Sequence, residues 1–220
     1  MSTPATLIGP AASVLAAARA IAARRNPLAL LLDGDPGVGK TAIADTLALE
    51  LTGSKFAIGH VNGQSVSADL VREWRERSAY GNLFSPRTCK RVDELDKASS
   101  AGVAELLTLL DYMPTGFAII ATTNDFAGLR SSWKGRLETR FVRLRVESPS
   151  ITEVAPWLSS RFRITQAQAQ AIARGAVPDG QLDGVNVRAA LLDADALVAI
   201  QSAASLPSVP SVPSPRRPRP

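Results

Sequence analysis

The sequence has very little of the chemistry on which disulfide-bonded and zinc-binding proteins depend. Its 220 residues include one cysteine, Cys89, and one histidine, His60. A single cysteine excludes an internal disulfide and a cysteine metal cluster, and a single histidine speaks against histidine-based catalysis or zinc binding. We therefore expect His60 to be a partly buried structural residue.

Long apolar runs are also missing. No stretch approaches the roughly 20 apolar residues that cross a bilayer, and the N-terminus lacks the basic and then apolar segments of a signal peptide. Hydrophobic residues make up 45% of the chain and charged residues 20%, a composition typical of globular proteins. We expect a soluble, intracellular protein of the cytoplasm with no membrane partner.

The positive charge is unevenly distributed. The net charge is +5, but Arg216, Arg217 and Arg219 lie in the last segment of the chain, 206–220. Its Pro-Ser-Val repeats and Pro/Arg ending have no residues for a core, so we expect a disordered tail. The rest of the chain is only mildly basic, which permits a nucleic-acid partner without requiring one.

A glycine-rich segment, GDPGVGKT, follows the apolar run 28–32 and opens a helical pattern. Its glycines let consecutive backbone N–H groups curl around an anion, and the helix N-terminus adds positive charge. Lys40 can reach the β- and γ-phosphates of a nucleotide, and the Thr41 hydroxyl can ligate Mg²⁺. The alternative is an ordinary glycine turn. The spacing predicts a site for ATP and Mg²⁺ formed by Gly34, Asp35, Pro36, Gly37, Val38, Gly39, Lys40 and Thr41.

Apolar, strand-like segments alternate with helical patterns as far as residue 147. Strands are expected at 28–32, 56–61, 89–93, 117–122 and 140–146. This alternation predicts an α/β fold in which a parallel P-loop NTPase sheet is sandwiched by helices. From 148 to 205 the pattern is helical only, with capping boxes at Ser150–Glu153 and Thr165–Gln168. We expect an ATPase core over 1–147, a small all-helical lid over 148–205 and the tail over 206–220.

A second charged segment, VDELDK, stands at the end of the third expected strand. Hydrolysis of ATP needs a carboxylate that holds the metal and a group that orients water. Asp93 is the candidate metal ligand and Glu94 the candidate that polarises water, with Asp96 as its alternative. The simpler interpretation is a solvated helix start. The preceding strand contains Lys90 and Arg91, whose burial would be unfavourable unless they are paired, so we expect a short strand with only Val92 well buried.

Five segments in order, GDPGVGKT, VDELDKAS, IIATTN, LETRF and GVNVRAAL, resemble the motifs of AAA+ ATPases. The resemblance extends from about Leu7 to Ala204. The compact spacing is similar to the clamp-loader and replication-initiator branches and to the DNA branch-migration motor. The lack of a large insert differs from the protease-associated and remodelling branches. After the lid we expect no clamp-loader collar domain, so the resemblance does not imply the usual clamp-loader pentamer.

The resemblance implies further roles near the γ-phosphate. Asn124 matches the sensor-1 residue, although an Asn in TTND could simply form a turn. Arg140 matches the arginine finger, which acts on a neighbouring subunit's nucleotide; Arg136 is the alternative, and a surface arginine is the simpler interpretation. Arg188 matches sensor 2 in the lid.

Two weaker resemblances concern the edges of the site. Leu7, Ile8 and Gly9 resemble the box that packs on adenine and would place Ile8 against the base; the alternative for the segment is an ordinary core contact. Asn62 resembles the polar switch that holds Glu94 away from water until a partner binds.

The motifs favour a Mg²⁺-dependent ATPase. The resemblance further implies an oligomer that shares its sites between subunits and acts on DNA or a DNA-bound replication or repair complex. The alternative is a slowly hydrolysing nucleotide-dependent adaptor that binds a protein partner. A third interpretation is a P-loop kinase. The sensor-2 match and the lack of a motif for binding a phosphate acceptor argue against it.

Overall fold

A computed structural model describes residues 7–78, 80, 85–129 and 131–204. Five strands form one sheet in the order β2-β3-β4-β1-β5, and every neighbouring pair is parallel. The predicted α/β class with a parallel sheet is therefore confirmed. The strands are β1 (Leu28–Asp33), β2 (Ile58–Asn62), β3 (Thr88–Asp93), β4 (Phe117–Thr123) and β5 (Val142–Arg145).

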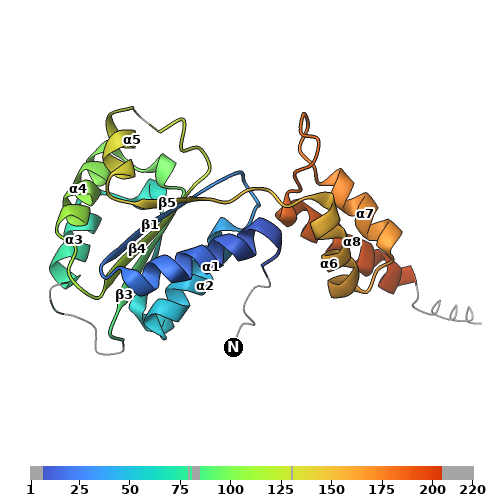
Figure 1. The fold of residues 1–220 in the computed structure, drawn as a ribbon, viewed down its shortest axis with the longest axis horizontal. Coiled ribbons are helices and arrows are strands. Elements are labelled where there is room, and N and C mark those ends of the chain that lie inside the picture. Colours follow the sequence, from blue (N-terminus) through green and yellow to red (C-terminus); the bar gives the residue numbers. More distant parts are fainter. Residues whose placement is uncertain (1–6, 79, 81–84, 130, 205–220) are drawn as a thin grey trace, which may run out of the picture.

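Helices cover both faces of the sheet (Figure 1). On one face lie α1 (Gly9–Arg24) and α2 (Lys40–Thr52); on the other lie α3 (Ala68–Ser78), α4 (Ser100–Asp111) and α5 (Ser131–Glu138). Because successive strand residues point to opposite faces, Leu30 and Leu32 pack in the first apolar layer and Leu31 in the second. The central strand β4 is buried at every position, including Thr122 and Thr123 at its carboxyl end.

Three helices follow the sheet and pack around a core of their own, at the right of Figure 1. They are α6 (Ile151–Phe162), α7 (Gln166–Gly175) and α8 (Val187–Ala204). Both predicted capping boxes are formed, at Ser150–Glu153 and Thr165–Gln168. Asn186 caps α8 by accepting a hydrogen bond from the Ala189 N–H at 3.1 Å. Below, these three helices are called the lid.

Several element boundaries differ from the sequence prediction. The strand β2 begins two residues late because Ser54 caps a 3-10 turn, η1 (Lys55–Ala57). Two more 3-10 turns follow strand ends, η2 (Gly63–Ser65) after β2 and η3 (Leu95–Lys97) after β3. The strand β5 is shorter than 140–146 because α5 and a turn occupy the residues before Val142.

The expectation of a short β3 is wrong. The strand has six residues, and Cys89, Arg91 and Val92 are all buried. Its two cations point to opposite faces of the sheet, so each finds a different partner. Lys90 lies 5.8 Å from the centre of the Trp74 ring, while Arg91 pairs with carboxylates on the other side.

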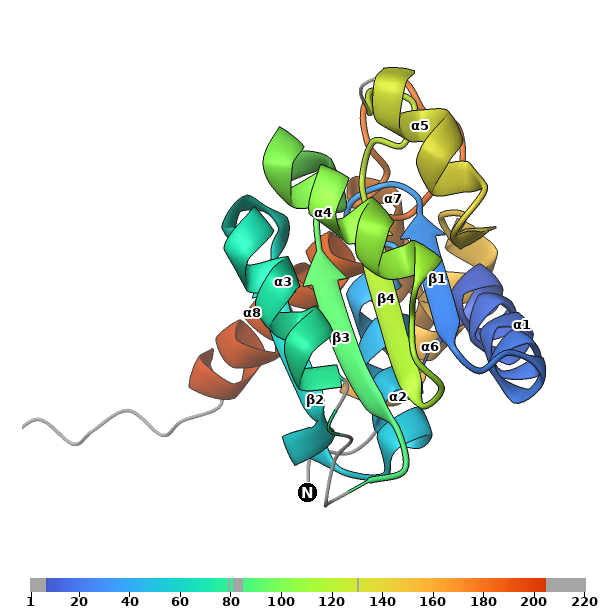
Figure 2. The same ribbon diagram turned by 90° about the vertical axis from the view of Figure 1, so that its left-hand side faces the viewer.

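The carboxyl ends of the parallel strands meet at one edge of the sheet, at the top of Figure 2. The segment 34–39 after β1 and the turns after β2, β3 and β4 all lie there, which makes this edge the expected place for a ligand. No helix in the described part of the chain is long and apolar enough to cross a membrane. The predicted tail, 206–220, lies outside the described residues.

Candidate functional site

The phosphate-loop segment turns the chain from β1 into α2 through backbone conformations that favour glycine. Gly37 has φ 85° and Gly39 φ 104°, both in the left-handed region. Gly37 is also closely approached by the lid, since a Cβ there would lie 2.0 Å from the Asn186 Oδ1 atom. Two features therefore require glycine at position 37: the left-handed backbone conformation and the close approach of Asn186.

Lys40 is buried and folded back onto the loop that it follows. Its ammonium donates to the Gly34 carbonyl at 2.6 Å and to the Asp35 carbonyl at 2.7 Å. Burial lowers the pKa of Lys40 below its ordinary value, while the carboxylates of Asp33 and Asp35 act in the opposite direction. The ammonium is therefore held beside the loop by two carbonyls that a phosphate would have to replace or share.

Glu94 has an unusual backbone conformation for a residue with a side chain. Its φ of 55° and ψ of 56° are left-handed, which is unfavourable by about 1–3 kcal/mol unless the surroundings impose it. Its N–H donates to the Thr122 hydroxyl at 3.2 Å. From the other side Gly63 packs so closely that a Cβ would lie 2.0 Å from the Glu94 carbonyl oxygen. Neighbouring strands thus fix the direction in which this side chain leaves the sheet.

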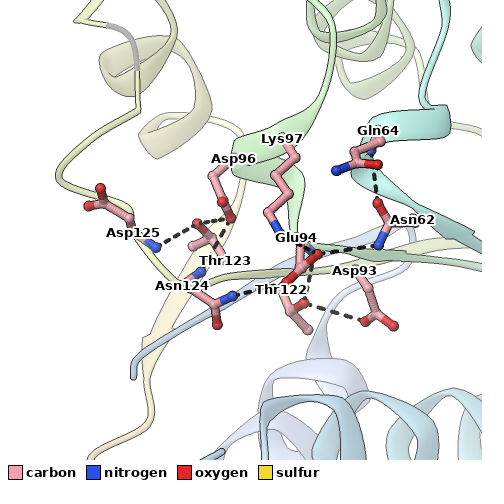
Figure 3. Close-up of polar contacts among 10 residues, drawn as sticks. All are labelled: Asn62, Gln64, Asp93, Glu94, Asp96, Lys97, Thr122, Thr123, Asn124 and Asp125. Atoms are coloured by element: carbon pink, nitrogen blue, oxygen red, sulfur yellow. Dashed lines mark hydrogen bonds and ion pairs between the residues drawn. The ribbon is translucent and has the colours of Figure 1, made fainter. Parts of the chain in front are cut away.

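Three side chains donate hydrogen bonds to the Glu94 carboxylate (Figure 3). Lys97 donates at 2.8 Å, Asn62 at 3.3 Å and Asn124 at 3.3 Å. The hydrogen bond from Lys97, followed by that from Asn62, keeps the pKa of Glu94 below its ordinary value. Glu94 is therefore ionised at neutral pH and held between the ends of β2 and β4.

Asp96 supports the same network from the far side (Figure 3). Its carboxylate accepts from the Thr123 hydroxyl at 2.9 Å and from the Asn124 N–H at 3.3 Å. These contacts set the position of Asn124, whose side chain then reaches Glu94. Asp96 is thus turned toward β4, and of Glu94 and Asp96 only Glu94 lines the cavity.

Asp93 is occupied on both carboxylate oxygens. Its Oδ2 atom lies 2.8 Å from His60 Nε2 and 3.1 Å from an Arg91 nitrogen, and its Oδ1 accepts from the Thr122 hydroxyl at 3.4 Å. His60 is exposed, so the expectation that it is partly buried is wrong, and its ring contacts a candidate site residue. No feature of the local sequence links His60 to Asp93; the parallel pairing of β2 with β3 does.

One cavity of about 610 Å³ brings the core and the lid together. The core contributes the phosphate loop and the ends of β3 and β4. The lid contributes five residues, Trp157, Arg161, Val187, Arg188 and Leu191. The N-terminal segment adds Leu7, Ile8 and Ala11. Thr41 and Asp93 line the same cavity, and such hydroxyl and carboxylate oxygens are the ligands that Mg²⁺ prefers. These two residues fit a Mg²⁺ site.

Comparisons with known proteins agree with this geometry. Residues 30–144 match the model of the ATPase family associated with various cellular activities (AAA). The chain belongs to the AAA family of ATPases.

Solved structures show the same fold for the AAA chain at low sequence identity. It is similar to a DNA polymerase III gamma subunit-related protein of Thermotoga maritima, with 12% identity over 81% of this chain and 70% of that one, at a TM-score of 0.54. The Thermotoga maritima RuvB Holliday junction branch migration motor gives 20% identity over 86% and 70%, at a TM-score of 0.58. A variant of the Thermotoga maritima RuvB is 22% identical, over 88% of this chain and 65% of that one, at a TM-score of 0.61. None of the curated proteins compared with the chain matches it.

Most of the residues predicted for the AAA site lie around the one cavity. Its lining includes Ile8, the loop from Pro36 to Thr41, Asp93 and Glu94, and also Asn124 and Arg188. Gly34 and Asp35 do not line it; their carbonyls hold Lys40. Asn62 lines it and contacts Glu94, as the resemblance to the polar switch implies.

Arg140 lies elsewhere in the AAA core. Its guanidinium makes a two-pronged contact with Asp111, from Nε to Oδ1 at 2.7 Å and from the second nitrogen to Oδ2 at 2.9 Å. A third bond reaches the Arg136 carbonyl at 3.0 Å. Neither Arg140 nor Arg136 lines the cavity of its own chain.

Sequence analysis missed several residues at the AAA site. Thr122, the first Thr of the IIATTN segment, touches both Asp93 and Glu94, and a polar residue near the end of the otherwise apolar strand β4 was a usable signal. The lid residues Trp157 and Arg161 resemble an ordinary amphipathic pair one turn apart. Asp45 and Arg91 meet only because α2 crosses β3.

Proposed function

We propose that this chain binds ATP with Mg²⁺ and hydrolyses it as one subunit of an oligomer that acts on DNA or on a DNA-bound complex. The observation that supports this most is the convergence on one cavity of the phosphate loop, Asp93, Glu94, Asn124 and Arg188. Transfer of a phosphoryl group to water needs a cradle for the phosphates, a metal-holding carboxylate and a group that orients the water. Each need has a candidate in this cavity.

In the proposed reaction the phosphate loop and Lys40 bind the β- and γ-phosphates. Thr41 and Asp93 would hold Mg²⁺, which neutralises phosphate charge when bound. Glu94 orients a water molecule and accepts its proton as the new bond to the γ-phosphorus forms and the bond to the bridging oxygen breaks. Asn124 and Arg188, with Arg140 from a neighbouring subunit, stabilise the charge on the transferred group.

Hydrolysis is tested by measuring ATP turnover of the full chain with Mg²⁺, with EDTA and with Lys40→Ala. We expect turnover only in the unmutated chain with Mg²⁺. The proposal fails if purified protein, including at high concentration, neither binds nor hydrolyses ATP. Turnover that persists equally in Lys40→Ala indicates a contaminating ATPase.

Action on DNA is supported by two observations of different kinds. The chain has a net charge of +5, and its fold is similar to a DNA branch-migration motor and to a DNA polymerase III gamma subunit-related protein. Turnover measured with single-stranded, duplex and four-way DNA should rise with at least one of them, and the rise should shrink with added salt because phosphate contacts release counterions. If none of the three DNA forms changes ATP turnover, the substrate of the proposed ATPase is a protein and not DNA.

A second candidate is a nucleotide-dependent switch that hydrolyses slowly. It is favoured by the cations on both carboxylates, Lys97 on Glu94 and Arg91 on Asp93. A single-turnover experiment separates the two candidates. A switch leaves bound ATP intact for many minutes in every DNA condition, whereas a motor converts it to ADP within its turnover time.

A further inference from the structure

Arg91 is a buried cation in an interior strand of the sheet. The residue is only 8% exposed, and its Nε atom has no hydrogen-bond partner among the described residues. Burial of an unpaired guanidinium is strongly unfavourable, so the side chain needs carboxylates beside it. It has two: Asp45 of α2 and Asp93 of its own strand.

Both carboxylates belong to the surroundings of the proposed Mg²⁺ site. Asp93 is two residues beyond Arg91 and so on the same face of β3. Asp45 is four residues beyond Thr41, one helical turn along the same side of α2. Both carboxylates line the nucleotide cavity. Arg91 thus bridges one proposed metal ligand, Asp93, to the helix that carries the other, Thr41.

We infer that Arg91 sets how much Mg²⁺ the nucleotide site requires, by placing a permanent positive charge 3.1 Å from the proposed metal ligand Asp93. This inference rests on the proposed function, because it assigns Asp93 to Mg²⁺. Two cations near one carboxylate repel each other, so Mg²⁺ binds against the charge of Arg91. Asp45 weakens that opposition by neutralising Arg91 and holding it toward α2. Arg91 is a positioning residue, acting through Asp93.

The charges lead to opposite effects for two substitutions. Asp45, Arg91 and Asp93 together carry a net charge of −1. Arg91→Met changes the sum to −2 and should strengthen Mg²⁺ binding, whereas Asp45→Asn changes it to zero and turns Arg91 fully onto Asp93. A mere tether between β3 and α2 would be weakened by both substitutions alike, with no opposite change in the Mg²⁺ requirement.

The test measures binding of a fluorescent, non-hydrolysable ATP analogue to the full chain as Mg²⁺ is titrated at constant ionic strength. Relative to the unmutated chain, the half-saturating Mg²⁺ concentration should fall about tenfold in Arg91→Met and rise severalfold in Asp45→Asn, because a unit charge at this range changes ion binding by such factors. A parallel titration with Mn²⁺, in which the EPR signal counts the free ion, reads metal binding directly.

The chain offers a matched control for each substitution. Lys90→Met removes the adjacent cation of β3, which points to Trp74 on the other face. Glu50→Gln removes a carboxylate of α2 that pairs with Arg19 instead. Both controls should leave the Mg²⁺ requirement within about twofold of the unmutated chain. Arg91→Lys keeps the positive charge but loses the planar guanidinium. Its Mg²⁺ requirement should stay near that of the unmutated chain even if its melting temperature falls.

Each outcome distinguishes this inference from the proposed function. If the unmutated chain binds the analogue with Mg²⁺, but Arg91→Met and Asp45→Asn shift the requirement in the same direction or not at all, the inference is overturned and the proposed function stands. If the unmutated chain shows no Mg²⁺-dependent binding, the proposed function fails and the inference fails with it. If Arg91→Met does not fold, Arg91→Gln removes the same charge with a polar side chain, and its Mg²⁺ requirement must still fall for the inference to stand.

Discussion

The cavity edge of β3 and β4 differs from the end of α5 in how its charged side chains are held. At the cavity, Glu94 receives donors from Asn62, Lys97 and Asn124, and its backbone is fixed by Thr122. At the end of α5, Arg140 has a single carboxylate partner, Asp111, and its remaining hydrogen bonds go to the neighbouring Arg136 carbonyl and Thr139 hydroxyl. Exposed ion pairs contribute little to stability, so Arg140 is the more easily redirected group. The contrast suggests one region completed within the chain and one available to a neighbour.

The largest effect that would sharpen this contrast is expected from Arg140→Ala. A finger acting between subunits contributes about 10³-fold or more to hydrolysis, so stimulated turnover should be lost while ATP affinity of the monomer stays unchanged. Arg136→Ala, one turn earlier, is the control and should have a small effect. Mixing Arg140→Ala with Lys40→Ala should restore part of the turnover, because some interfaces then combine an intact pocket with an intact finger. Turnover independent of protein concentration and insensitive to Arg140→Ala would instead indicate a self-contained site.

Glu94→Gln tests the region completed within the chain. The amide keeps the size of the side chain but cannot accept a proton, so turnover should fall by about 10²-fold or more while ATP still binds. Asp96→Asn is the comparison, because that carboxylate positions Asn124 without lining the cavity. Its turnover should fall less. Full turnover in Glu94→Gln would remove Glu94 from the proposed mechanism.

Lys40→Ala should weaken ATP binding by about tenfold or more, because a buried ammonium that pairs with phosphate oxygens is lost. Isothermal titration calorimetry with a non-hydrolysable ATP analogue measures this. Lys55→Ala, on the 3-10 turn before β2, is a lysine control away from the cavity and should bind normally. Equal affinities in the two variants would refute the phosphate-loop assignment.

Gly63→Ala asks whether the cavity edge is as tightly constrained as its contacts indicate. A Cβ would lie 2.0 Å from the Glu94 carbonyl oxygen, so the substitution should destabilise the fold by about 1–3 kcal/mol and shift Glu94. Gly175→Ala, where a Cβ would meet nothing within 4 Å, is the matched control. Chemical denaturation of both measures the difference. A neutral Gly63→Ala would show that this edge relaxes easily.

The smallest effect is expected from Asp111→Asn. The Arg140 guanidinium holds the pKa of Asp111 below its ordinary value, so the pair is present above that ordinary pKa and is lost as pH falls through the lower value. At neutral pH the melting temperature should hardly change, because the pair is exposed. In acid, the unmutated chain should approach the variant. A large loss of stability at neutral pH would place Arg140 among the rigidly held residues.

Much of the site is predictable because it follows chain-local rules. The loop before Lys40 has its own glycine spacing, and the acidic pair of Asp93 and Glu94 stands where β3 ends. The contacts that modify these residues arise between segments distant in sequence. His60 reaches Asp93 because β2 pairs in register with β3, and Arg91 reaches Asp45 because α2 packs over that strand. In the sequence, Lys90 and Arg91 are two cations in a strand expected to be buried, and their partners on other segments cannot be identified. The wrong prediction of a short β3 followed from this.

The contact between Asn186 and Gly37 has a mechanical consequence for the lid. Asn186 caps α8 and lies against the phosphate loop. The first turn of α8 is therefore in contact with the loop, and the rest of the helix extends away from that contact. The helix α8 has 18 residues and is therefore about 27 Å long at 1.5 Å per residue. A tilt of about 5° at the loop would move its far end by about 2.4 Å over that length. A small change in the position of the phosphate loop would thereby become a larger displacement at the far end of α8.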